Sequence, residues 1–224
     1  MEIKPIARIK SDFKTKFGIP RQPGLAPDLE AAIVFEEEYR IADALRGLEE
    51  FSHLWIIWEF SENIRTEFSP TVRPPRLGGD VRLGVFATRS PFRPNPIGLS
   101  CVKILGIEQT ADSGTVIRVS GADLMDGTPI YDIKPYVPYT DSHPDALGGF
   151  TNQGFHEVEV VCAPELIEKI PENKRAGLLQ ALRQDPRPAY HNDPERVYGM
   201  LFAGFDVHFR VDGDVLTVTD IVKN

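Results

Sequence analysis

The chain has 224 residues, of which 42% are hydrophobic and 26% charged, and its formal net charge is -8. This composition suits one sizeable domain, or one domain with a small second one, and it excludes an intrinsically disordered chain. No apolar run approaches the roughly 20 residues of a membrane-spanning helix, and the first ten residues are not followed by the apolar stretch of a secretory signal. Cys101 and Cys162 have no second cysteine or histidine at ligand spacing. We therefore expect a reduced, cytoplasmic protein without a disulfide, a metal or a membrane partner.

The charges are unevenly distributed along the chain. Residues 65–96 carry six arginines against two acidic residues, and residues 1–21 carry six basic residues against two acidic ones, so each segment has a local charge of +4. Two basic segments on an acidic protein can steer a polyanion to one face. Arginines also occur on ordinary solvated surfaces, so the charge pattern alone leaves a nucleic-acid partner open.

The N-terminal half reads mainly as short strands. Apolar residues at Ile41, Ala44, Leu45 and Leu48 recur at helical spacing and predict a helix. The nearly continuous apolar run HLWIIWEF that follows predicts a strand buried on both faces. Further strands are predicted at 82–88, 99–108, 115–121 and 157–163, with a turn at Ser113-Gly114.

The C-terminal part combines a helix with a hairpin. Leucines 178, 179 and 182 share one side of a predicted helix at about 172–184, which stops before a proline. Asp212-Gly213-Asp214 separates two alternating apolar runs and predicts a β-hairpin. We predict a mainly β protein with a barrel or sandwich domain at 1–140, a linker at 141–156 and a small α+β domain at 157–224.

A proline-rich segment presents the first set of functional candidates. In RLGVFATRSPFRPNPIGLS, three prolines fix an extended loop that carries Arg89, Arg93 and Asn95. Guanidinium groups on a stiff loop suit the binding of a carboxylate or phosphate, and Gly98 allows the backbone to approach closely. The alternative is a structural crossover in which the arginines have no function.

An acidic segment, ADLMDGTPIYDIKPY, supplies the second set. Asp126-Gly127 predicts a turn, and alternation along the following strand places Asp132, Lys134 and Tyr136 on one face. This arrangement fits a general acid–base cluster and fits a structural salt bridge equally well.

Two other features carry weaker signals. The stiff turn IPRQPG presents Arg21 and Gln22, and an amide of this kind can both donate to and accept from adenine. Ser52-His53 lacks the surroundings of a catalytic serine, so His53 is better explained as part of an apolar strand. The chain has neither a dinucleotide-binding glycine fingerprint nor a P-loop, so an adenosyl cofactor would be held outside a Rossmann fold.

Six motifs together resemble the TsaA-like family of tRNA methyltransferases. In chain order they are IPRQPG, GLEEFSHLWIIWEF, TVRPPRLGG, GVFATRSPFRPNPIGLS, DLMDGTPIYDIKPY and QDPRPAY. The resemblance implies a single-sheet, β-barrel-like domain that binds S-adenosylmethionine in a non-Rossmann manner, a small C-terminal domain and a homodimer. It also implies methylation of the exocyclic nitrogen of threonylcarbamoyl-modified adenosine beside the anticodon of tRNA, without a metal.

Matching the motifs residue by residue gives three groups of candidate site residues. The expected cofactor contacts are Pro20, Arg21, Gln22, Ser61, Glu62, Arg89, Leu99, Ser120, Gly121, Ala122 and Asp123. The expected catalytic residues are Asp126, Asp132, Lys134 and Tyr136, with one of the two aspartates as the base. The expected contacts to substrate and tRNA are Arg73, Arg76, Arg82, Phe92, Arg93 and Asn95.

Two alternatives stay open from the sequence. One is a non-catalytic module that binds single-stranded RNA through a barrel face, and the other is a methyltransferase that acts on a small molecule. The first predicts no affinity for S-adenosylmethionine, and the second predicts turnover that does not depend on the basic residues.

Overall fold

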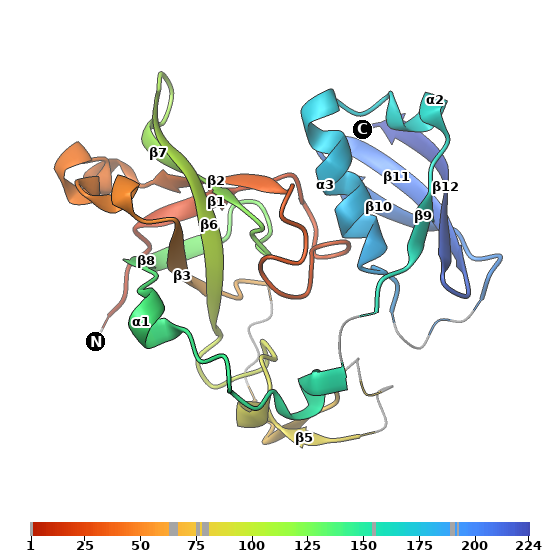
Figure 1. Cartoon of the computed structure of the whole chain (residues 1–224), viewed down its shortest axis with the longest axis horizontal. Helices are drawn as coiled ribbons and strands as arrows, with labels where there is room; N and C mark the ends of the chain where they lie inside the picture. The colour runs from red at the N-terminus through yellow and green to blue at the C-terminus, as the bar shows by residue number, and fades with distance from the viewer. Residues whose placement is uncertain are drawn as a thin grey trace.

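The described strands form two larger β-sheets and a two-stranded one (Figure 1). The computed structural model describes residues 2–62, 67–74, 77, 81–153, 156–188, 191 and 193–224. The predicted mainly β class is confirmed. None of the helices in these described ranges is long and apolar enough to cross a membrane.

The N-terminal sheet closes on itself. Its six strands are β1 (Ala7–Lys10), β2 (Glu30–Phe35), β3 (His53–Glu59), β6 (Ile97–Thr110), β7 (Gly114–Ser120) and β8 (Pro129–Pro135). They pair antiparallel in the order β1-β2-β7-β6-β3-β8, and β1 also pairs with β8, which makes a closed barrel. Alternate side chains such as Ile33, Ile56 and Ile117 fill its interior and are fully buried.

Strand β3 differs from the prediction in one respect. Its side chains alternate between buried and half-buried, so only one face is fully buried, whereas both were predicted to be. The reason is the closed barrel, in which every strand has an inner and an outer face. Trp58 lies on the inner face, and Trp55 lies on the outer one.

The C-terminal sheet has the order β10-β11-β12-β9. Its elements are β9 (Glu159–Val161), α2 (Pro164–Ile167), α3 (Glu172–Arg183), β10 (Tyr198–Phe202), β11 (Phe205–Asp212) and β12 (Val215–Lys223). Strand β9 is parallel to β12, and the other pairs are antiparallel. The predicted helix at 172–184 and the hairpin at Asp212-Gly213-Asp214 are confirmed, and Gly213 takes a positive φ of 55° in the turn. The predicted strand at 157–163 is shorter than expected.

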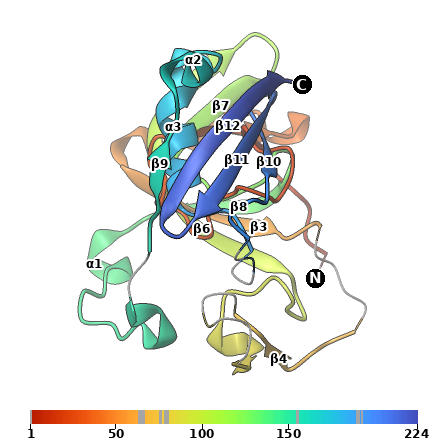
Figure 2. The same ribbon diagram turned by 90° about the vertical axis from the view of Figure 1, so that its right-hand side faces the viewer.

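Each of the two sheets has its own core, and the segment between β1 and β2 packs into that of the C-terminal sheet. This segment extends from the barrel toward α3 (Figures 1 and 2). Phe13, Ala26 and Leu29 from this segment pack with the leucines of α3 and with the C-terminal sheet. An added Cβ at Gly177 of α3 would lie 2.9 Å from the carbonyl oxygen of Asp28. The segment that carries IPRQPG is therefore held between the barrel and α3.

Two predicted elements are wrong. The stretch from Ile41 to Leu48 forms two short 3₁₀ helices, η2 (Ala42–Leu45) and η3 (Leu48–Glu50), which follow η1 (Glu37–Tyr39). Gly47 separates them with φ 88°, and Ile41 is 60% exposed, whereas Leu45 and Leu48 pack against the core of the barrel.

The predicted strand at 82–88 is the second error. It contains only β5 (Leu83–Gly84), paired with β4 (Thr71–Val72), and then turns into η5 (Val85–Ala87). Strand β4 has only two residues, so it offers no further backbone groups with which β5 could pair. Beyond β8, α1 (Pro138–Asp141) and η6 (Gly149–Gln153) complete the described elements.

The packing of Trp58 on strand β6 gives a direct test of the barrel. An added Cβ at Gly98 would lie 2.3 Å from the Trp58 ring, whereas an added Cβ at Gly106 of the same strand meets nothing within 4 Å. We expect Gly98→Ala to lower the free energy of unfolding by about 1–3 kcal/mol, because the indole must move. Gly106→Ala should leave it unchanged or raise it by up to about 1 kcal/mol. Urea denaturation measures both, and equal effects would contradict this packing.

Candidate active site

The IPRQPG loop contacts the segment that follows strand β7. The Gly24 amide donates to the carbonyl oxygen of Gly121 at 2.8 Å, and the Gly121 amide donates to that of Leu29 at 2.8 Å. Gly121 has φ 73°, and an added Cβ there would lie 3.0 Å from the Cα of Gly24. Only glycine combines this conformation with this close approach. Two of the predicted cofactor-binding segments are thus in direct contact.

A third predicted segment joins them through side chains. Arg89 Nη1 donates to Gln22 Oε1 at 2.6 Å, and the Gln22 amide nitrogen donates to the carbonyl oxygen of Arg21 at 2.6 Å. Arg21 in turn donates to the carbonyl oxygen of Arg187, at 3.4 Å, in the C-terminal QDPRPAY motif. The stiff loop after η5 therefore lies beside IPRQPG, with Gln22 and Arg89 presented together.

The other predicted cofactor contacts are arranged less uniformly. Lys16 Nζ donates to the carbonyl oxygen of Glu62 at 2.8 Å, which places Ser61 and Glu62 near the start of the same segment. Pro20 is buried. Leu99 is 53% exposed, and its side chain points to the opposite face of β6 from the buried Ser100.

Among the residues that the structure describes, Asp123 is the strongly perturbed ionisable group near these contacts. Burial raises the pKa of Asp123 to about 6, against the opposing effects of the Ser100 hydrogen bond, its own backbone and Arg89. Ser100 Oγ donates to Asp123 Oδ1 at 2.6 Å, and Trp58 Nε1 donates to Ser100 Oγ at 2.9 Å. A carboxyl group with a pKa near neutrality beside a charged arginine is typical of a functional site.

The sequence analysis did not single out Ser100 or Trp58. A signal was present, because Ser100 occupies an inner-face position of β6, between Gly98 and Val102, where an apolar residue is expected. The alternation of an apolar strand can therefore reveal a buried polar group, although it does not identify the partner of that group.

The predicted catalytic residues fall into two separate groups. Asp126 accepts from the Ser11 amide at 3.0 Å and from Lys14 Nζ at 2.5 Å, and it lies on the same loop as Asp123. Asp132 lies on β8 and pairs with Lys134 at 2.9 Å, as the predicted shared face requires. The Tyr136 ring lies 5.9 Å from that of Trp55, on the outer side of the barrel.

The predicted substrate contacts include one residue with a clear local role. Arg93 Nη1 donates to the carbonyl oxygens of Val85 and Thr88, at 3.2 and 2.7 Å, and its guanidinium lies 5.7 Å from the Phe86 ring centre. These contacts stabilise the turn before the proline-rich loop. Arg73, Arg82 and Asn95 have exposed side chains, Phe92 is half-buried, and Arg76 lies outside the described residues.

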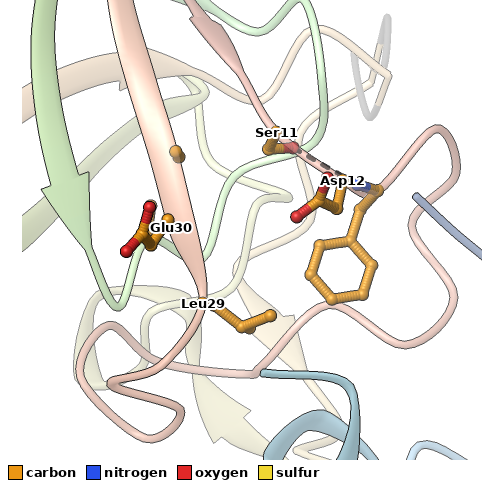
Figure 3. A pocket seen from close by; sticks show the side chains of 7 residues that line it. Ser11, Asp12, Leu29 and Glu30 are labelled. Atoms are coloured by element: carbon orange, nitrogen blue, oxygen red, sulfur yellow. Dashed lines mark hydrogen bonds between the residues drawn. The ribbon is translucent and has the colours of Figure 1, made fainter. Parts of the chain in front are cut away.

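A small pocket lies between the segment that follows β1 and the start of β2 (Figure 3). It is lined by Ser11, Asp12, Phe13, Leu29, Glu30, Ala31 and Ala122. Asp12 also pairs with Lys174 of α3 at 2.6 Å, so the pocket belongs to the junction between the two sheets. Of the predicted cofactor contacts, only Ala122 lines it. Within the described ranges, no three His, Cys, Asp or Glu side chains are grouped so as to hold a metal.

Comparison with known proteins identifies the family. The model of the tRNA-methyltransferase O N-terminal domain matches residues 8–142, and that of the TrmO C-terminal domain matches residues 157–224. The chain belongs to the tRNA-methyltransferase O family. The resemblance inferred from the six motifs is confirmed.

Curated and solved relatives of the TrmO family agree with this assignment. The chain is 42% identical to the tRNA (adenine(37)-N6)-methyltransferase of Escherichia coli K12, over 94% of this chain and 93% of that one. It is 40% identical to a putative S-adenosylmethionine-dependent methyltransferase, RcsF, of Pseudomonas aeruginosa, over 98% and 96%. A crystal structure of TrmO from Pseudomonas aeruginosa superposes with a TM-score of 0.82 at 34% identity, covering 99% of this chain and 98% of that one.

The raised pKa of Asp123 predicts a pH-dependent effect of Asp123→Asn. The folded state holds its carboxyl proton up to a pH of about 6, whereas the unfolded state loses it near the ordinary carboxyl value of 3.8. The stability of the wild-type protein therefore decreases as the pH rises from the unfolded-state pKa to the folded-state pKa, and it is not recovered at higher pH. Relative to wild type, Asp123→Asn should gain up to about 2–3 kcal/mol between about pH 4 and about pH 7, as measured by urea denaturation.

Asp141→Asn is a matched control with the opposite sign. The Val137 amide and Trp55 Nε1 hydrogen bonds lower the pKa of Asp141. The stability from these bonds is present near neutral pH and is lost as the pH falls below the ordinary carboxyl range. Asp141→Asn should thus be less stable than wild type near pH 7 and approach it in acid. The same pH trend in both variants would contradict the environment described for Asp123.

Proposed function

We propose that this protein transfers a methyl group from S-adenosylmethionine to N6 of adenosine 37 in tRNA. The observation that carries the proposal is the meeting of Gln22, Arg89 and Asp123 in a chain of the TrmO family. These residues come from three segments that are distant in sequence, and each was expected at the cofactor site. The names of the Escherichia coli and Pseudomonas aeruginosa relatives supply the tRNA position and the cofactor.

The chemistry of these side chains fits the cofactor. S-adenosylmethionine carries a carboxylate, an ammonium group and ribose hydroxyls besides its adenine. Arg89 and Gln22 can donate hydrogen bonds to a carboxylate or to adenine, and Asp123 can accept from an ammonium or a hydroxyl group. When bound, the cofactor supplies an electrophilic methyl carbon on a positively charged sulfur. We propose that these three residues hold it, with Arg21 and the backbone of residues 120–122 beside them.

We further propose that the substrate adenosine carries a threonylcarbamoyl group and lies in the anticodon loop. The lone pair of its N6 is delocalised into a urea-like linkage, so the nitrogen is a poor nucleophile until its proton leaves. A carboxylate that takes this proton as the N–CH₃ bond forms would accelerate the reaction by roughly 10²–10⁴-fold. The threonyl carboxylate would be bound by Arg93 of the stiff loop, since Arg89 is proposed to hold the cofactor.

Asp126 is the better candidate for this proton acceptor. It lies on the same loop as Asp123, and its side chain is 22% exposed, compared with 45% for Asp132. Lys134 and Tyr136 would then orient groups on the outer face of β8. The exposed Arg73 and Arg82 are proposed phosphate contacts, together with Phe92 and Asn95 near the substrate.

Three features stay predictions from the sequence. They are the homodimer, the cytoplasmic location and the division into domains at 1–140 and 157–224 with a linker at 141–156. The core that α3 shares with the segment between β1 and β2 supports close packing of the two parts.

The function is tested by methyl transfer from radiolabelled S-adenosylmethionine to defined tRNAs. We expect transfer to tRNA with threonylcarbamoyl-adenosine 37, and at least tenfold less to the same tRNA without that group. Calorimetry should show binding of S-adenosylmethionine to the protein alone. Tight tRNA binding without cofactor binding would instead indicate a non-catalytic RNA-binding module. Cofactor binding with no transfer to either tRNA would favour a small-molecule substrate.

Substitution of the two candidate bases tests the proton transfer. Asp126→Asn should lower kcat by about 10²-fold or more while leaving cofactor affinity near the wild-type value, because asparagine keeps the hydrogen bond from Ser11 but cannot take a proton. Asp132→Asn is the matched variant and should lower kcat by less than about tenfold. Single-turnover rates would separate chemistry from product release. Near-wild-type turnover in both variants would exclude proton removal by these carboxylates.

A further inference from the structure

A line of hydrogen bonds runs from the interior of the barrel to Asp123. Trp58 Nε1 donates to Ser100 Oγ at 2.9 Å, and Ser100 Oγ donates to Asp123 Oδ1 at 2.6 Å. Ser100 is 0% exposed and Trp58 is 6% exposed. The bond from Trp58 to Ser100 is therefore buried, and the bond from Ser100 to Asp123 is partly buried. In such surroundings the direction and geometry of a hydrogen bond have large effects.

The direction of these bonds is fixed by the chemistry of the groups. The indole nitrogen can only donate, so the Ser100 oxygen must accept from it. The single hydroxyl proton of Ser100 is then available for the Asp123 carboxylate. An alanine or cysteine at position 100 would lack such a donor or have only a weak one.

The indole itself packs closely against two neighbours. Trp58 and Gly98 are register partners in β3 and β6, and an added Cβ on Gly98 would lie 2.3 Å from the ring. The Phe60 ring centre lies 4.2 Å from that of Trp58. The donor at the start of the line therefore has one position, set by the barrel itself.

We propose that Trp58 and Ser100 are positioning residues that fix the Asp123 carboxylate, in its ionised form, for hydrogen bonding to S-adenosylmethionine. The proposal rests on the proposed function, because it requires Asp123 to contact the cofactor. Burial raises the pKa of this carboxyl and so favours its protonated form, whereas the Ser100 hydrogen bond lowers the pKa. Arg89 is the charged group that acts on Asp123, and it lowers the pKa of this carboxyl.

The two residues act only through Asp123, which distinguishes them from cofactor-binding residues. Removal of the Ser100 hydroxyl should favour protonation of Asp123 and so weaken cofactor binding most strongly near neutral pH. At higher pH the carboxyl ionises even without Ser100, so most of the affinity should return. A purely structural defect would weaken binding equally at all pH values.

The test compares wild type, Ser100→Ala, Trp58→Phe and Asp123→Asn. Calorimetry with S-adenosylmethionine is run from about pH 5 to about pH 9, and the carboxyl carbon of Asp123 is titrated by NMR in the cofactor-free protein. In wild type, affinity should rise as the pH increases through about 6. Ser100→Ala should bind S-adenosylmethionine at least about tenfold more weakly than wild type near pH 7. The midpoint of its affinity change and the midpoint of its Asp123 titration should both lie at higher pH. Trp58→Phe should shift them in the same direction by less, and Asp123→Asn should abolish the pH dependence.

Thr128→Val is the matched control. Thr128 is 4% exposed, and its hydroxyl donates to the carbonyl oxygen of Met125 at 2.6 Å, so this variant also deletes a buried hydroxyl. Its binding and its Asp123 titration should match those of wild type.

The other possible results distinguish failure of the positioning role from failure of the proposed function. An Asp123 midpoint in Ser100→Ala equal to that of wild type would overturn the positioning role, and Trp58→Phe provides the same decision if Ser100→Ala does not fold. Wild-type affinity in Asp123→Asn would also overturn it, together with the proposed contact of Asp123 with the cofactor, but it would leave the proposed methyl transfer to tRNA intact. Absence of cofactor binding by wild type itself would instead reject the proposed function.

Discussion

The contact between Gly24 and Gly121 is the constraint on which the candidate site depends. Two backbones meet there through a 2.8 Å hydrogen bond, and there is no room for a side chain on Gly121. This contact places IPRQPG against the end of strand β7. Gln22 can then reach Arg89, and the turn after Gly121 directs Asp123 toward Ser100. One close backbone approach thus brings together three segments that are up to about a hundred residues apart.

The C-terminal part of the protein supports the same segment from the other side. Lys174 pairs with Asp12, and Gln180 binds Asp28 through its side chain, with α3 lying against Leu29. Because these contacts surround IPRQPG in sequence, the C-terminal sheet is coupled to the cofactor-binding segment and is not simply attached to the barrel. Arg21, which donates to the Arg187 carbonyl, extends this coupling to the QDPRPAY motif.

Local patterns predicted the local features of this fold well. The hairpin at Asp212-Gly213-Asp214 and the helix at 172–184 follow from turn chemistry and apolar spacing, which act over a few residues. The shared face of Asp132 and Lys134 follows from strand alternation in the same way. The prediction of a helix at 41–48 was wrong, because four apolar residues at helical spacing are also compatible with 3₁₀ turns. Gly47 interrupts this stretch. The structural contacts of Arg93 were not predicted, because only the turn at η5 brings the carbonyl oxygens of Val85 and Thr88 within its reach.

The long-range contacts of the site could not be predicted from such patterns. The pairing of Trp58 with Gly98 depends on the register between β3 and β6, and the bond from Ser100 to Asp123 depends on where the loop after β7 lies. The motif resemblance identified the segments, and the structure shows how three of them meet.

A crystal structure of the protein with S-adenosylmethionine bound would show whether these three segments form the cofactor site. The expected result is that the cofactor contacts Gln22, Arg89 and Asp123, with the hydrogen bonds from Trp58 to Ser100 and from Ser100 to Asp123 retained. A cofactor bound elsewhere, for example in the pocket between Ser11 and Ala122, with these three side chains untouched, would contradict it.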